Sequence, residues 1–137
     1  DCWGKSLPHQ PSIGVPLTVA GPSVQRGTTV SAPSTILDLV ATFLEAGEAV
    51  PLPAMESRSL WPLLTGQAEA TRSCVFSALE DWRVAFDGRY KLVAWGDASR
   101  RAMYDLQTDP SETCDISGLA DFDDIQSTLV EHLRSYA

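Results

Sequence analysis

The spacing of hydrophobic residues changes along the chain, and each change predicts a different kind of element. Residues 15–22 form a short apolar run closed by Gly21-Pro22, which is typical of a strand covered on both faces in a mostly parallel sheet. Further on, apolar residues recur at the spacing of a helix that begins near Thr35 and ends at Gly47. The apolar face of this predicted helix comprises Ile36, Leu37, Val40, Phe43 and Leu44.

Polar and proline residues mark the limits of the elements in this first half. Thr35 and Asp38 have the spacing of a capping box, which predicts the start of the helix. A proline-rich link follows, and the block 57–66 then predicts a single helical turn. The residues expected to pack this turn are Leu60, Leu63 and Leu64.

From about Arg72 the pattern becomes that of short strands followed by one closing helix. The predicted strands are Cys74–Leu79, Trp82–Phe86, Tyr90–Trp95 and Ala102–Leu106. The helix begins at about Asp121 and places Phe122, Ile125, Leu129, Leu133 and Tyr136 on one face. The predicted fold of the chain is therefore α+β: a strand, a helix and a link, then a four-stranded antiparallel sheet packed by a C-terminal helix.

The second and third predicted strands are joined around Asp87-Gly88, a strong hairpin signal whose register the sequence leaves open. A two-residue turn would place Val84 opposite Lys91. A three-residue loop would instead align Val84 with Leu92, which matches apolar residues better.

Composition narrows the possible partners. The chain of 137 residues carries 18 acidic and 10 basic residues, a net charge of −8, and such a balance disfavours nucleic acid. No window approaches the ~18 continuous apolar residues of a membrane span. The three cysteines, Cys2, Cys74 and Cys114, are far apart and odd in number, so they indicate neither a disulfide framework nor a metal site.

The opening segment holds the candidate binding residues. Lys5, one of only two lysines, follows Trp3-Gly4, where its ammonium group could be held against an anion. His9 lies four residues later and could also help to bind an anion, because an imidazole changes charge near neutral pH. Lys5 and His9 are the predicted substrate-binding residues.

Five blocks in order resemble the C-terminal region of the sulfatase family, within the alkaline-phosphatase-like superfamily. The resemblance covers nearly the whole chain. Its blocks are Trp3-Gly4-Lys5-Ser6 with Val15-Pro16-Leu17, Ile36–Gly47, Ser57–Gly66, Arg89–Leu92, and Met103–Leu106 with Asp109–Glu112.

The resemblance implies an α/β fold divided into two parts. Residues 1–70 would be the C-terminal part of the catalytic domain, with a strand and helix left over from its large sheet. Residues 71–137 would be the small antiparallel C-terminal domain. In this family a Cys or Ser within Cys/Ser-x-Pro-x-Arg becomes a formylglycine nucleophile, and Asp and Asn side chains hold a cation, usually calcium. Lys5 matches the family's late lysine, which contacts the sulfate.

Departures from the family pattern indicate what this chain lacks. None of the three cysteines is followed by the modification motif, and Ser6-Leu7-Pro8-His9-Gln10 ends in Gln where the motif has Arg. His9 stands where the family commonly has tyrosine. The resemblance therefore implies that the nucleophile and the calcium site lie upstream. We expect no catalytic residue, metal site or cofactor in this chain, and no activity from it alone.

Two alternatives to a sulfatase fragment stay open. The chain could be a fragment of a related phosphonate or phosphate monoester hydrolase, or a non-catalytic binding module. The expected partner is a small-molecule sulfate ester bound by the longer enzyme, and an exposed sheet edge could allow self-association. The sequence decides neither the substrate's organic group, nor between a Cys and a Ser precursor, nor between a cytoplasmic and a periplasmic location.

Overall fold

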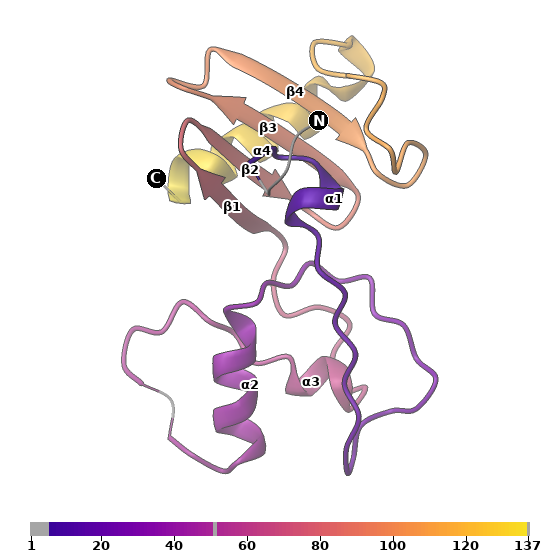
Figure 1. Cartoon of the computed structure of the whole chain (residues 1–137), viewed down its shortest axis with the longest axis vertical. Helices are drawn as coiled ribbons and strands as arrows, with labels where there is room; N and C mark the ends of the chain where they lie inside the picture. The colour runs from indigo at the N-terminus through magenta and orange to yellow at the C-terminus, as the bar shows by residue number, and fades with distance from the viewer. Residues whose placement is uncertain (1–5, 51, 137) are drawn as a thin grey trace. The chain divides into compact units, whose positions relative to one another are not determined.

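A computed structural model describes residues 6–50 and 52–136, which fold as two compact units (Figure 1). The sheet unit comprises residues 6–16 and 76–136 of the described chain, so its N-terminal segment is distant in sequence from its sheet. The loop-rich unit comprises residues 17–75. The resemblance predicts a boundary near residue 70 between the catalytic domain and the C-terminal domain of a longer enzyme. This boundary stays a prediction.

A four-stranded antiparallel sheet, in the order β1-β2-β3-β4, is the centre of the sheet unit and confirms the predicted fold (Figure 1). Its strands are β1 (Val75–Leu79), β2 (Trp82–Phe86), β3 (Tyr90–Trp95) and β4 (Arg100–Asp105). Since each strand pairs with the next along the chain, only short turns are needed to connect them.

Alternate residues of the strands point to opposite faces, and both faces are covered. One face carries the core residues Trp82, Val84, Val93, Ala102 and Tyr104. The short helix α1 (Gln10–Ile13) lies on this side, and Ile13 packs against the core. The other face buries Ala85, Leu92 and Met103, and α4 (Asp123–Tyr136) packs against β2 and β3 there.

The closing helix begins slightly later than the sequence predicts. The 3-10 turn η1 (Ala120–Phe122) precedes α4, and Asp123 and Asp124 lie in the first turn of α4, where acidic side chains favour the helix dipole. Leu129 and Leu133 of the predicted apolar face are buried. Tyr136 at the end of that face is half exposed but stacks on Phe76, with ring centroids 4.4 Å apart.

The β2–β3 hairpin is confirmed, but both of its predicted registers are wrong. The structure pairs Val84 with Val93 and Phe86 with Lys91. The turn is centred one residue later than Asp87-Gly88, because the Asp87 carboxylate accepts the backbone N–H groups of Arg89 and Tyr90 at 2.9 and 2.7 Å. Gly88 has a φ of 102°, which glycine adopts without strain, so it occupies the first position of the two-residue turn.

The loop-rich unit contains two helices among its described residues, α2 (Asp38–Ala46) and α3 (Trp61–Leu64). The predicted single turn at 57–66 is thus α3, and Leu60 and Leu63 are buried beside it. No helix in the described chain is long and apolar enough to cross a membrane.

The face of α2 that the unit buries is the polar one, contrary to the sequence pattern. Asp38 and Thr42 are buried, whereas Ile36 just before the helix and Phe43 within it are 62% and 70% exposed. The Asp38 carboxylate accepts the backbone N–H groups of Thr35 and Arg58 at 3.0 and 2.9 Å. These hydrogen bonds tie a loop to the polar side of α2 and leave its apolar side facing outward.

The predicted strand at 15–22 is wrong for this structure. No strand is found there, and Val15, Leu17 and Val19 have substantial exposed area. A strand forms only where a neighbour takes up its backbone hydrogen bonds, and no described strand pairs with this segment. The apolar run has the residue types of a buried strand, but a strand also needs a paired neighbour, and the sequence pattern does not show whether one is present.

Candidate functional site

Lys5, the first candidate residue, lies outside the described residues. The chain that directly follows it, Ser6 to Ile13, is fixed to the sheet unit. The indole Nε1 of Trp82 donates a hydrogen bond to the carbonyl of Ser6 at 2.9 Å, and Pro8 is buried. The site can therefore be built from the segment next to Lys5 and from the groups that hold this segment.

The carboxylate of Glu112 is the centre of this attachment. Its Oε2 accepts the backbone N–H of Gln10 at 2.7 Å, and its Oε1 forms an ion pair with the ammonium group of Lys91. The side chains of Glu112 and Lys91 are each only 1% exposed. An ion pair so fully removed from water must satisfy its charges internally, which ties the two side chains to one arrangement.

Lys91 connects the sheet to the N-terminal segment. It lies in β3 on the same face as Val93, and its Nζ donates a hydrogen bond to the carbonyl of Pro8 at 2.7 Å. Burial lowers the pKa of Lys91 from its usual 10.5 to about 8, so the ammonium form prevails at neutral pH. Together, Lys91 and Glu112 hold the backbone on both sides of His9, and we call them the buried pair.

His9, the second candidate residue, contacts the same carboxylate. Its Nδ1 lies 3.3 Å from Oε2 of Glu112, and its ring meets that of Tyr104 edge-on at 6.1 Å between centroids. Burial, and then the nearby charge of Lys91, lowers the pKa of His9 below its usual 6.5. His9 is thus neutral at pH 7, and its Nδ1 faces a protein carboxylate, so the ring is less suited to bind an anion than the sequence suggests.

Two aspartates hold the backbone near the loop that contains Glu112. The Asp109 carboxylate accepts the backbone N–H groups of Thr113 and Cys114, each at 2.8 Å. Asp105 accepts two hydrogen bonds from Arg89 and one from Gln107, and the Arg89 contact is the main reason why the pKa of Asp105 falls to about 2. Asp109, and Asp105 through Gln107, thus hold the backbone of this turn region.

No group of three or more His, Cys, Asp or Glu side chains is placed to hold a metal ion among the described residues. Cys74 is buried, and its thiol is 3.6 Å from the carbonyl of Val75. Cys114 is exposed, and Cys2 lies outside the described residues. The arrangement of the described residues can therefore position a backbone segment, but it offers no set of metal ligands.

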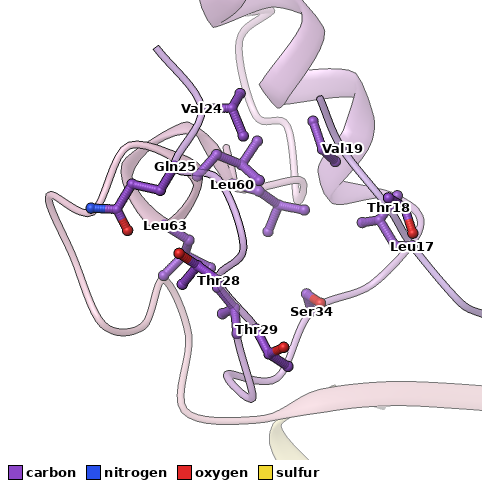
Figure 2. A pocket seen from close by; sticks show the side chains of 12 residues that line it. Leu17, Thr18, Val19, Val24, Gln25, Thr28, Thr29, Ser34, Leu60 and Leu63 are labelled. Atoms are coloured by element: carbon purple, nitrogen blue, oxygen red, sulfur yellow. The ribbon is translucent and has the colours of Figure 1, made fainter. Parts of the chain in front are cut away.

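The loop-rich unit has a hollow of about 330 Å³ that is unlike an anion site. Figure 2 shows it between the loop that carries Val24 and Gln25, the segment around Thr18, and Leu60 beside α3. All of its lining side chains are uncharged, and neither candidate residue is among them.

Sequence reasoning gave Lys91 and Glu112 no role of their own, although both stand in blocks that carry the family resemblance. The signal for Lys91 was its position within an otherwise apolar strand, where alternation places it on the face of Val93. Glu112 could not have been found in this way, because its partner is 21 positions away across a turn and only the fold brings the two together.

Comparison with known proteins places the chain among sulfatases. The family model described as "N-sulphoglucosamine sulphohydrolase, C-terminal" matches residues 2–137. Arylsulfatase K of Xenopus laevis is 28% identical over an alignment of 127 positions, which covers 80% of this chain and 24% of that protein. The chain thus spans about a quarter of the length of this relative.

Solved structures show the same fold. A protein in complex with its substrate D-glucosamine-2-N,6-O-disulfate superposes with a TM-score of 0.72 and 24% identity, covering 82% of this chain and 26% of that one. A phosphonate monoester hydrolase from Silicibacter pomeroyi has a TM-score of 0.68 and 22% identity, covering 85% of this chain and 27% of that one.

Proposed function

The chain belongs to the family of C-terminal sulfatase domains, and we propose that it is the C-terminal region of an enzyme that hydrolyses sulfate esters. The observation that carries this proposal is the match of the family model over residues 2–137. In the proposed enzyme this region presents Lys5 to the sulfate, and the small sheet supports the segment that contains it. The substrate is a small-molecule sulfate ester.

Lys5 is proposed to contact the non-bridging oxygens of the sulfate. Cleavage of a sulfate ester concentrates negative charge on these and on the leaving oxygen, and a cation already in place lowers the cost of that charge. The buried pair supports this role, because Lys91 and Glu112 fix the backbone at Pro8 and Gln10. A segment anchored so soon after Lys5 limits the positions that its ammonium group can reach.

Calcium and formylglycine are proposed to be held by residues of the longer enzyme. The described residues do not fit either group, since they offer no cluster of metal ligands and Cys74 and Cys114 are not followed by the modification motif. When bound, calcium would polarise the sulfate oxygens and formylglycine would supply the nucleophile. We derive from this chain only the binding and orientation of the anion.

The test uses the natural gene and two proteins. Reading the gene upstream of Asp1 should reveal a Cys/Ser-x-Pro-x-Arg segment in frame. The protein that contains it should hydrolyse an aryl sulfate, and Lys5→Ala should reduce kcat by about a hundredfold or more, as expected for loss of a transition-state contact. Lys5→Arg should retain part of the activity, and the 137-residue chain alone should show none. Turnover by the short chain that disappears in Lys5→Ala would contradict the proposal.

A second function, hydrolysis of phosphonate monoesters, is favoured by one observation, the similarity to the Silicibacter pomeroyi enzyme. Sulfate monoesters and phosphonate monoesters both carry a single negative charge on a tetrahedral centre, so one lysine could serve either. Comparing kcat/KM of the full-length protein for an aryl sulfate and an aryl phosphonate separates the two. A preference for the phosphonate would replace the sulfatase proposal.

A further inference from the structure

Two arginines lie on either side of an alanine on the face of the sheet that α4 covers. In the ladder, Arg83 of β2 lies opposite Ala94 of β3, and Ala94 lies opposite Arg101 of β4. The three residues therefore share one face of three adjacent strands. Because the middle residue is alanine, the two guanidinium groups flank an open space rather than a bulky side chain.

This space is a cavity of about 180 Å³ within the sheet unit. The β3–β4 turn closes one side through Gly96 and Ala98, and α4 contributes Val130, Leu133 and a third arginine, Arg134. The cavity is smaller than the several hundred cubic ångströms typical of pockets for drug-sized ligands. It suits a small ion or one functional group of a larger molecule.

The charges around the cavity are unbalanced. Three arginines and one acidic residue, Asp97, line it, in a chain whose net charge is −8. Asp97 already accepts the backbone N–H of Ser99 at 2.9 Å. Within the part of the chain that the structure describes, Arg83, Arg101 and Arg134 form no ion pair, whereas Arg72 and Arg89 each pair with an aspartate.

Arg101 adds a separate observation. Its Nε is buried and has no hydrogen-bond partner in the described structure. A buried donor without an acceptor is costly, and this one belongs to a charged group. A guanidinium group binds an oxyanion through paired N–H donors, so an anion in the cavity would supply the missing acceptor.

We propose that the cavity between Arg83, Arg101 and Arg134 is a binding site for a small oxyanion, either the sulfate or the carboxylate group of a ligand. The site is distinct in sequence from Lys5 and does not depend on the esterase activity proposed above. Its apolar floor, formed by Ala94 and Leu133, excludes water from one side of the anion and so strengthens its contacts with the arginines.

The test is a titration of the isotope-labelled 137-residue chain with sodium sulfate, followed by backbone amide NMR at constant ionic strength. The amides of Ala94, Gly96 and Ala98 should shift in a saturable way. Arg101→Gln and Arg83→Gln should each weaken sulfate binding about tenfold, equivalent to about 1.4 kcal/mol. Arg101→Lys should weaken it less than Arg101→Gln, because the charge is kept while the paired donors are lost.

Arg26→Gln is the matched control, since it removes the same charge from an exposed position in the loop-rich unit and should leave binding unchanged. Circular dichroism establishes that each variant is folded. A parallel titration with sodium acetate separates the two sources of the group: tighter sulfate binding assigns a sulfate ester, and tighter acetate binding assigns a carboxylate. Shifts that chloride reproduces equally, or equal weakening by Arg26→Gln, would overturn the proposal.

Discussion

The sheet unit and the loop-rich unit use their side chains in opposite ways. The sheet unit buries apolar residues on both faces of its strands and adds one buried ion pair, Lys91 with Glu112. The loop-rich unit buries the polar residues Asp38 and Thr42 of α2, and the apolar side chain of Phe43 on the same helix is mostly exposed. A hydrophobic core thus stabilises the first unit, whereas in the second the buried face of α2 is held by hydrogen bonds to loops.

This difference indicates that the two units differ in how stable each would be by itself. A surface helix normally directs its apolar stripe into a core, and contiguous exposed apolar side chains are typical of surfaces that contact other protein. The apolar side of α2 fits this description, since Ile36, Leu37 and Val40 are exposed together with Phe43. We therefore expect the sheet unit to be stable by itself and the loop-rich unit to be the weaker of the two.

The largest expected effect comes from breaking the buried pair. Lys91→Met leaves the Glu112 carboxylate buried without its ammonium partner, which should lower the free energy of unfolding by about 3–5 kcal/mol. Urea unfolding followed by tryptophan fluorescence measures this, because Trp82 and Trp95 belong to the sheet unit. The double variant Lys91→Met/Glu112→Gln removes both charges and should regain much of the loss. A loss below about 1 kcal/mol in the single variant would contradict the assigned role.

A smaller and more local effect is expected in the loop-rich unit. Asp38→Ala removes the acceptor of two backbone N–H groups and the ion-pair partner of Arg72, which should cost about 2 kcal/mol. Amide hydrogen exchange should accelerate across α2 while β3 stays protected. Glu45→Ala, an exposed acidic position on the same helix, is the control. Equal acceleration in both units would show that they unfold together.

The pH dependence of the sheet unit offers a third test. The pKa of Asp105 is lowered in the folded chain to about 2, mainly by its hydrogen bond with Arg89. A depressed carboxyl pKa contributes stability that is complete above the unfolded value of about 3.9 and is lost as pH falls towards 2. Arg89→Gln should flatten the stability curve between pH 4 and 2, and because the Arg89 side chain is half exposed, its effect on stability at pH 7 should be small. If Arg89→Gln leaves the dependence of stability on pH unchanged, Arg89 is not the cause of the low pKa of Asp105.

The smallest effect on stability is expected at the exposed face of α2. Phe43→Ser should change the free energy of unfolding by less than about 0.5 kcal/mol, because the side chain is already in contact with water. If the chain self-associates, as exposed strand and helix surfaces favour, this variant should reduce association in sedimentation velocity. Leu119→Ser, an exposed position of the sheet unit, should not. Association that neither variant reduces would favour a sheet edge instead.

Local patterns in the sequence were enough for most of the sheet unit. The short apolar runs Trp82–Phe86 and Tyr90–Trp95, bounded by turn residues, predicted β2 and β3 at their observed bounds. The predicted hairpin register was wrong because the Asp87 carboxylate accepts the backbone N–H groups of Arg89 and Tyr90, which shifts the turn. The spacing of apolar residues gives no sign of this contact.

The sequence by itself determined the antiparallel sheet with its closing helix, the α2 helix and the sulfatase family, since each rests on local periodicity or on the order of short blocks. Only the tertiary structure decided which face of α2 is buried, that residues 15–22 form no strand, and that Lys91, Glu112 and His9 meet. These outcomes depend on which segments lie side by side. Burial and pairing are properties of two surfaces in contact, whereas a sequence pattern describes only one of them.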